Sequence, residues 1–247
     1  MKRTIQKFWW LLIMIPSLFV AGFVIWAETP LGPMPEALAA LESDETVNVT
    51  TTTWLVFSPS QVDPTAGLIF YPGGRVDPRS YAPAAHAMAA QGYLVVITPM
   101  PLNLAVFAPG RAAEVIAAYP EIRSWAIGGH SLGGAMAANF AHQNPSQVMG
   151  VFLWASYPSE NDDLSALDLH IVSVYGTLDG VATPETVLAA QPLLPAGTLW
   201  TAIQGGNHAQ FGWYGDQPGD NPATISREEQ QEQAITATLD LWGVYEK

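Results

Sequence analysis

Gly129-His130-Ser131-Leu132-Gly133 decides how the rest of this chain is interpreted. The residues before it, 124–128, form a short and mostly apolar run that is typical of a strand, and residues 132–141 are small and Ala-rich, as in a closely packed helix. A Gly-x-Ser-x-Gly motif between a strand and a helix is typical of a nucleophile elbow, a sharp turn that lifts the serine hydroxyl above a sheet. Glycines flank the serine because a Cβ would collide across so tight a turn. The stretch therefore predicts that Ser131 is a catalytic nucleophile.

The wider sequence indicates one α/β domain. The chain has 247 residues, 49% of them hydrophobic and 13% charged, which is enough apolar mass for a large core. Strand-like runs are expected at 47–58, 67–71, 93–99, 125–128, 148–155, 171–176 and 199–203, and helices at 78–91, 104–119, 132–144, 183–194 and 226–242. Several of the strand-like runs are continuously apolar, as in parallel strands covered on both faces. The alternation predicts a mostly parallel, doubly wound sheet that binds ligands at the carboxyl ends of its strands.

The N-terminus carries a basic flank followed by an apolar run. Lys2, Arg3 and Lys7 precede the uncharged residues 8–27, which as a helix would rise about 30 Å, the thickness of a bilayer core. We expect residues 1–27 to form a signal anchor, a transmembrane helix in contact with the lipid bilayer. A cleaved secretory signal is the alternative. In both cases the remainder is expected outside the cytoplasm, with residues 28–46 as a linker and 47–247 as the catalytic domain.

Charge and cysteine content exclude several classes of protein. Beyond residue 27 there are six basic and 22 acidic residues, a net charge of −16, which argues against nucleic-acid binding. Cysteine is absent, so there is neither a disulfide framework nor a cysteine-ligated metal site. No metal or organic cofactor is expected.

A serine nucleophile needs a base and an acid that orients the base. His208 follows the predicted strand 199–203 in a glycine-containing loop, and we expect it to be the base. Asp179 follows the strand 171–176 and lies between serine and histidine in chain order, so we expect it to be the acid, with Glu160 as the competing candidate. The other histidines (His86, His130, His142 and His170) are interpreted as packing or surface residues.

Two backbone N–H groups should stabilise the oxyanion. Leu132, which follows the nucleophile, is expected to supply one, and the loop Tyr71-Pro-Gly-Gly-Arg75 the other. Gly74 is the expected donor in that loop, and Arg75 replaces it if the loop is offset by one residue. The residues Arg75, Phe211, Trp213 and Tyr214 are candidate substrate-binding residues, although the aromatic ones could simply pack and Arg75 could pair with Asp77.

These motifs resemble those of α/β-hydrolases, in particular the small, lidless kind related to dienelactone hydrolases. The resemblance spans roughly residues 47–245 and rests on the elbow, on residues 71–77 and on residues 205–215. It implies that Ser131, Asp179 and His208 form a catalytic triad, with Gly74 and Leu132 as oxyanion donors. Dienelactone hydrolases use cysteine where this chain has Ser131, which argues against a dienelactone substrate. Only residues 156–169 separate two predicted strands where related esterases insert a cap, so an open site is expected.

The sequence thus predicts a membrane-tethered serine hydrolase that cleaves small-molecule esters, lactones or similar acyl compounds. The same triad could serve an acyltransferase, a thioesterase or a perhydrolase. An anchored binding protein built on a hydrolase scaffold is the alternative from another class.

Overall fold

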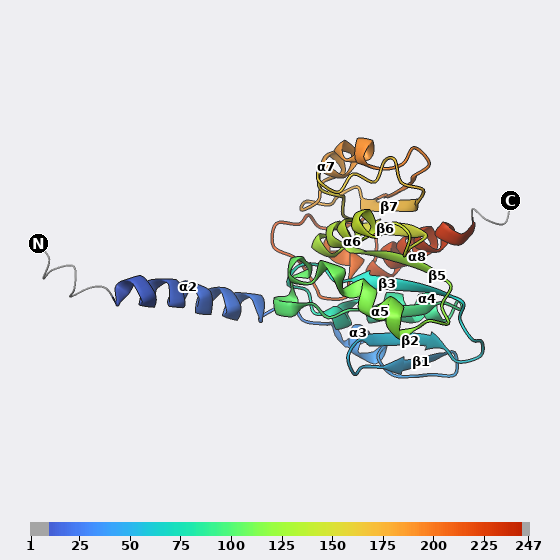
Figure 1. Cartoon of the computed structure of the whole chain (residues 1–247), viewed down its shortest axis with the longest axis horizontal. Coiled ribbons are helices and arrows are strands. Elements are labelled where there is room, and N and C mark those ends of the chain that lie inside the picture. Colours follow the sequence, from blue (N-terminus) through green and yellow to red (C-terminus); the bar gives the residue numbers. More distant parts are fainter. Residues whose placement is uncertain (1–9, 244–247) are drawn as a thin grey trace, which may run out of the picture.

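The structure, a computed structural model, describes residues 10–243. A single sheet with the strand order β1-β2-β4-β3-β5-β6-β7-β8 runs through the domain (Figure 1). Its strands are β1 (Val47–Thr50), β2 (Leu55–Pro59), β3 (Ala66–Tyr71), β4 (Leu94–Ile97), β5 (Ser124–His130), β6 (Gly150–Trp154), β7 (His170–Gly176) and β8 (Leu199–Ile203). From β4 to β8 all neighbours are parallel, whereas β2 pairs antiparallel with both β1 and β4. The predicted mostly parallel sheet is therefore present.

The predicted strand at 47–58 is two strands rather than one. β1 and β2 form an antiparallel hairpin with Val47 opposite Pro59 and Thr50 opposite Val56. The chain turns at the polar run Thr51-Thr52-Thr53. The three side chains are exposed, so this segment has no row of apolar residues that a strand could bury on one face of the sheet. The hairpin adds an antiparallel edge to the otherwise parallel sheet.

Helices cover both faces of the sheet. The helices α4 (Ala82–Ala89) and α8 (Arg227–Gly243) pack on one face, and α5 (Ala112–Ala118) and α6 (Leu132–Gln143) pack on the other. The shorter pieces are α3 (Pro35–Ala39), α7 (Pro184–Ala189), η1 (Pro78–Tyr81), η2 (Pro101–Asn103), η3 (Ala105–Phe107), η4 (Pro109–Arg111), η5 (Gln191–Leu193) and η6 (Ala209–Phe211). The central strands are buried on both faces, which matches their continuously apolar sequences. The segment between β6 and β7 contains neither helix nor strand, so no cap covers that end of the sheet.

The prediction of a transmembrane helix is wrong. Helix α2 (Leu11–Ala27) has 17 residues, and no helix within residues 10–243 is long and apolar enough to cross a membrane. At 1.5 Å per residue, α2 rises about 25 Å, which is less than the bilayer core of about 30 Å. Residues 8 and 9 of the predicted span, with Lys2, Arg3 and Lys7, lie outside the described residues. The predicted bilayer contact loses its support with the helix, and the expected location outside the cytoplasm stays a prediction.

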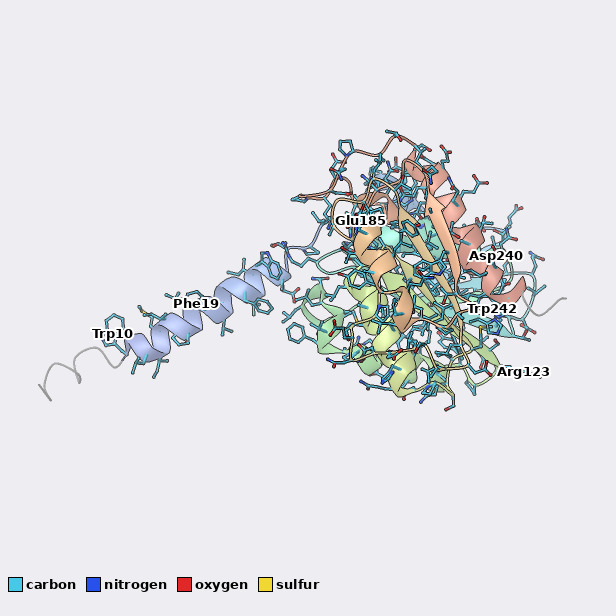
Figure 2. The ribbon with its side chains drawn as sticks, turned by 90° about the horizontal axis from the view of Figure 1, so that it is seen from above. Trp10, Phe19, Arg123, Glu185, Asp240 and Trp242 are labelled. Carbon is cyan, nitrogen blue, oxygen red and sulfur yellow. The ribbon has the colours of Figure 1, made fainter. Side chains whose placement is uncertain are left out.

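Helix α2 projects away from the domain, which it meets through its C-terminal part, where Phe23 contacts Phe107 (Figure 1). Side chains such as Phe19, which is 76% exposed, stand clear of the domain (Figure 2). At the C-terminal end of α2, Arg75 Nε donates to the Trp26 carbonyl and Arg75 Nη2 donates to the Thr29 carbonyl, both at 2.8 Å. The Arg75 guanidinium also lies 4.2 Å from the Trp26 ring. The segment after α2 is therefore attached to the loop that follows β3.

Candidate active site

Ser131 occupies a strained turn between β5 and α6. Its φ of 52° and ψ of −123° lie in a region that residues other than glycine rarely adopt. Three hydrogen bonds hold it there: its N–H donates to the Trp154 carbonyl at 2.9 Å, and its own carbonyl accepts from Ser156 Oγ at 2.7 Å and from Ala135 N at 3.2 Å. Neighbouring strand, helix and loop thus fix the backbone that carries the serine hydroxyl.

The glycines around Ser131 are required by close backbone packing. A Cβ on Gly129 or on Gly133 would fall onto the Tyr71 carbonyl oxygen, which belongs to the neighbouring strand β3. A Cβ on Gly134 would lie 2.6 Å from Ser156 Oγ. Helix α6 therefore begins directly against the ends of β3 and β6, as the motif predicts.

Asp179 and His208 meet at the carboxyl end of the sheet. His208 Nδ1 lies 2.8 Å from Asp179 Oδ2, and both side chains are almost completely buried. The other carboxylate oxygen of Asp179 accepts from the N–H groups of Val181 and Ala182, at 2.8 and 2.7 Å. The carboxylate is thus oriented by three donors. The competing candidate Glu160 is exposed and makes no bond to His208 within the described chain.

The edge of the His208 ring opposite Asp179 carries the nitrogen Nε2. Within the part of the chain that the structure describes, His208 Nε2 is buried and has no hydrogen-bond partner, and neither has Ser131 Oγ. The His208 ring lies with its centroid 4.4 Å from that of His130, the residue before Ser131. The structure therefore brings Asp179 and His208 together but makes no hydrogen bond between His208 Nε2 and Ser131 Oγ. Hydrogen bonds of this kind are often long or incomplete before substrate binds.

Residues that the sequence analysis did not identify hold the histidine loop. Gln230 of α8 accepts from Asn207 N at 2.9 Å and donates to Asn207 O at 2.7 Å. Asp220 accepts from Ala209 N at 2.8 Å and from Gly180 N at 3.0 Å, so one carboxylate ties the residue after His208 to the residue after Asp179. Both roles depend on contacts between distant segments, and no local motif indicates them.

In the loop after β3, one N–H is left without an acceptor. Gly73 N donates to Tyr81 Oη at 3.0 Å, and Arg75 N donates to the Asn103 carbonyl at 2.8 Å. Within residues 10–243, the N–H groups of Gly74 and Leu132 have no hydrogen-bond acceptor. The two residues are neighbours, since a Cβ on Gly74 would lie 3.0 Å from Leu132 Cδ2. The backbone of Arg75 is therefore not available as the alternative donor.

A cavity of about 290 Å³ opens beside Ser131. It is lined by Ser131, Leu132, Ala135, Ala155, Ser156, Tyr157, Val181 and Ala182. Its walls come from the start of α6 and from the loops after β6 and β7, and most of its side chains are small. The sequence analysis named only Ser131 and Leu132 among these residues. For Ser156 and Tyr157, their position directly after the predicted strand 148–155 was the available signal.

The structure does not bring the candidate substrate residues to this cavity. Arg75 contacts the end of α2, and its expected partner Asp77 pairs with Arg79 at 2.6 Å instead. Phe211 is completely buried and stacks on His130, with ring centroids 5.8 Å apart. Tyr214 is also buried, and its hydroxyl donates to Gln217 at 3.0 Å.

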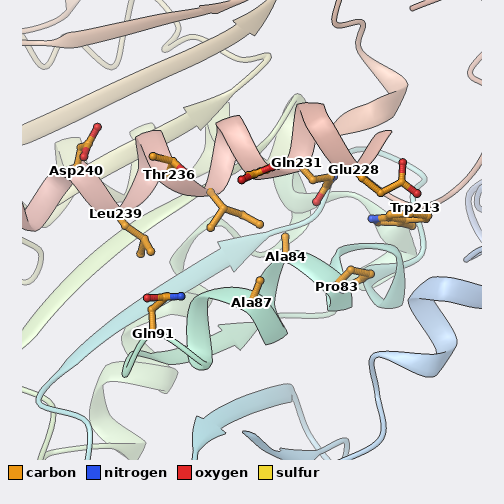
Figure 3. Close-up of a pocket in the computed structure, with 12 residues that line it drawn as sticks. Pro83, Ala84, Ala87, Gln91, Trp213, Glu228, Gln231, Thr236, Leu239 and Asp240 are labelled. Carbon is orange, nitrogen blue, oxygen red and sulfur yellow. The ribbon is translucent and has the colours of Figure 1, made fainter. Parts of the chain in front are cut away.

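Trp213 lines a different and wider groove between α4 and α8 (Figure 3). This groove has a volume of about 570 Å³, with Ala84 and Ala87 on one side and Glu228 and Asp240 on the other. It contains none of Ser131, Asp179 and His208. Within residues 10–243, no group of His, Asp and Glu side chains is arranged to hold a metal ion.

Residues 67–232 match the family described as Alpha/beta hydrolase family. The chain belongs to this family. Solved structures agree on the fold. An esterase domain from a Rhodothermus marinus protein superposes with a TM-score of 0.57 at 12% identity, over 76% of this chain and 91% of that one. A candidate dienelactone hydrolase from Klebsiella pneumoniae superposes with a TM-score of 0.60 at 14% identity, over 82% of this chain and 98% of that one. No curated protein sequence matches the chain.

This result confirms the resemblance to α/β-hydrolases that the elbow and its flanking motifs indicated. In this α/β-hydrolase Ser131 follows β5, Asp179 follows β7 and His208 follows β8. All three lie at the carboxyl ends of parallel strands, where doubly wound sheets bind their ligands.

Proposed function

We propose that this α/β-hydrolase is a serine hydrolase that cleaves small carboxylic esters or lactones. The observation that carries the proposal is the His208 ring, bound through Nδ1 to Asp179 at 2.8 Å, with a buried and unpartnered Nε2. Ser131 follows His130, whose ring centroid lies 4.4 Å from that of His208, and is held in a strained turn at the edge of a cavity. Membership of a hydrolase family, and the fold shared with an esterase domain, support the same reading.

In the proposed reaction His208 Nε2 takes the proton of Ser131 Oγ as the serine attacks the substrate carbonyl. Asp179 holds the Nδ1–H tautomer of His208 and stabilises the imidazolium that forms. The N–H groups of Gly74 and Leu132 donate to the developing oxyanion. The imidazolium then protonates the leaving alcohol, and a water molecule, activated by His208, hydrolyses the acyl enzyme.

The cavity beside Ser131 favours a small acyl group. About 290 Å³ is near the lower limit of ligand pockets, and the walls offer small apolar side chains such as Ala135, Ala155 and Ala182. We therefore expect short acyl esters and small lactones to react faster than long-chain esters. Val181 and Tyr157 line the cavity and are 44% and 37% exposed, so the cavity is open to solvent on their side. A leaving group can extend into solvent there.

The test uses the full-length chain, its Ser131→Ala variant and a matched Ser165→Ala control at an exposed position. The wild type and the control should hydrolyse p-nitrophenyl acetate and butyrate and should be labelled by a fluorophosphonate probe on the peptide that contains Ser131. Ser131→Ala should lose at least about 10⁴-fold in kcat and take no label. Hydrolysis by a folded Ser131→Ala variant at the wild-type rate would refute the proposal.

A further inference from the structure

Tyr81 has a buried hydroxyl that the proposed reaction does not use. It lies at the end of η1 and is 1% exposed. Tyr81 Oη accepts from the N–H of Gly73 at 3.0 Å and lies 2.9 Å from His130 Nδ1. Burial raises the pKa of the Tyr81 phenol above its usual range, so the hydroxyl keeps its proton. Because Gly73 occupies it as an acceptor, its own proton is free to be donated to His130 Nδ1.

This hydrogen bond determines the state of His130. A histidine ring whose Nδ1 accepts a hydrogen bond is neutral and carries its hydrogen on Nε2. Burial lowers the pKa of His130 well below its usual range, and the neighbouring His208 lowers it further. The two rings lie with centroids 4.4 Å apart, so a charged His130 would oppose the proton that His208 must accept. A neutral His130 removes that repulsion.

The same hydroxyl fixes one end of the oxyanion loop. Gly73 is bound to Tyr81, and Arg75 is bound to the Asn103 carbonyl, so Gly74 lies between two anchored residues. A Cβ on Gly73 would come within 2.8 Å of both Tyr81 Oη and His130 Nδ1, which explains why this contact needs glycine. Since His130 precedes Ser131 and Leu132, one hydroxyl connects the segments that carry both free N–H groups.

We propose that Tyr81 is a positioning residue that holds the Gly74 N–H against the oxyanion and keeps His130 neutral beside the catalytic base. The inference rests on the proposed function and adds to it a residue from outside the three catalytic segments. The effect of Tyr81 should appear in the transition state, because the oxyanion forms only there.

Tyr71 offers a matched control. It is also fully buried, its hydroxyl also accepts a backbone N–H, from Ala112 at 2.7 Å, and it also donates, to the Pro109 carbonyl at 2.8 Å. Removal of this hydroxyl therefore breaks the same number of buried hydrogen bonds. The structure places Tyr71 at the end of β3, before the oxyanion loop, and its hydroxyl bonds lead to η4 and α5 rather than to Gly73 or Gly74.

The experiment compares the full-length wild type, Tyr81→Phe and Tyr71→Phe in hydrolysis of p-nitrophenyl acetate and in inhibition by a trifluoromethyl ketone, which forms a tetrahedral adduct with a serine. Tyr81→Phe should lower kcat roughly 10- to 100-fold with KM changed less than about threefold, and should raise the ketone Ki by a similar factor to the loss in kcat. Tyr71→Phe should lose less than about threefold in either measure, although both variants should be destabilised to a similar degree.

A second pair of variants decides the question if Tyr81→Phe does not fold. His130→Asn keeps an acceptor for the Tyr81 hydroxyl, whereas His130→Leu removes it, so only His130→Leu should weaken ketone binding by more than about tenfold. Equal kinetics within both pairs, in an active enzyme, would overturn the positioning role alone. A wild type that neither hydrolyses the ester nor binds the ketone at Ser131 would overturn the proposed function itself.

Discussion

The two halves of the candidate site are built from different parts of the chain. The acid–base half consists of two side chains, Asp179 and His208, joined by one hydrogen bond of 2.8 Å. The oxyanion half consists of two backbone N–H groups, on Gly74 and Leu132, which no protein acceptor occupies within residues 10–243. A side chain can be recognised by its residue type and place in the sequence, but a free N–H depends on what its neighbours in space accept.

The two halves also differ in how they are supported. Asp220 and Gln230, both from the C-terminal quarter of the chain, hold the segments next to Asp179 and His208. The oxyanion loop is held by Tyr81 and Asn103, and through Arg75 it is attached to the segment that ends α2. The acid–base half thus depends on the C-terminal segment and the oxyanion half on the N-terminal part of the chain.

The largest expected effect breaks the acid–base half. Asp179→Asn keeps the size of the side chain but removes the charge and favours the wrong His208 tautomer, so kcat should fall by about 10⁴-fold. Hydrolysis of p-nitrophenyl acetate measures it. Asp168→Asn, at an exposed position, makes the same chemical change and should leave kcat within about twofold. A folded Asp179→Asn variant with wild-type kcat would exclude this role.

The next effect disturbs the oxyanion half without touching a polar side chain. In Gly74→Ala the new Cβ would lie 3.0 Å from Leu132 Cδ2 and 3.5 Å from Leu104 Cδ2, so either the Leu132 side chain or the loop must move by a few tenths of an ångström, and we expect the tightly anchored loop to be displaced in part. Because one oxyanion donor contributes about 2.7–4 kcal/mol to transition-state stabilisation, a partial displacement should lower kcat roughly 10- to 100-fold. Gly110→Ala, which meets no atom within 4 Å, is the control and should retain wild-type kcat. Equal activity of the two variants would argue against Gly74 as a donor.

His130 lies between the two halves, and it should make the free energy of unfolding depend on pH. The pKa of His130 in the folded state lies well below the usual value. Below about pH 6.5 His130 therefore binds a proton in the unfolded chain but not in the folded chain. The contribution of His130 to the free energy of unfolding is therefore fully present above that pH. It is lost as the pH falls, by up to about 1.4 kcal/mol per pH unit. Urea denaturation at pH 7.5, 6.0 and 5.0 should show a shallower decline for His130→Asn than for the wild type. Parallel declines would show that His130 does not stay neutral in the folded state.

The smallest expected effect tests how far the N-terminal attachment matters. Arg75→Ala removes the bonds to the Trp26 and Thr29 carbonyls but keeps the backbone bond from Arg75 N to Asn103. We expect kcat to fall less than about threefold, and the melting temperature to fall by a few degrees at most. A loss above tenfold in kcat would show that α2 controls the oxyanion loop more directly than its backbone contacts indicate.

Several parts of the site could be predicted because their signals are local. The spacing of glycines around Ser131, and the order of serine, acid and histidine after three different strands, are local features of the sequence, and the structure brings Asp179 and His208 together. The sequence Ser226-Arg-Glu-Glu229 is an equally local signal for the start of α8, and Ser226 Oγ accepts from Glu229 N at 3.1 Å. The length of α2 could not be predicted, because an uncharged run from residue 8 to 27 does not indicate at which residue the helix begins.

By itself the sequence determined the elbow, the alternation of strands and helices and the chain order of the candidate triad, since each depends on residue type and spacing alone. Only the tertiary structure decided which N–H groups stay free, that Arg75 turns to α2 and that Trp213 lines a separate groove. The physical reason is that a backbone donor or an aromatic ring acquires its role from its partners in space. Tyr81, Asn103, Asp220 and Gln230 reach those partners from segments that are distant along the chain.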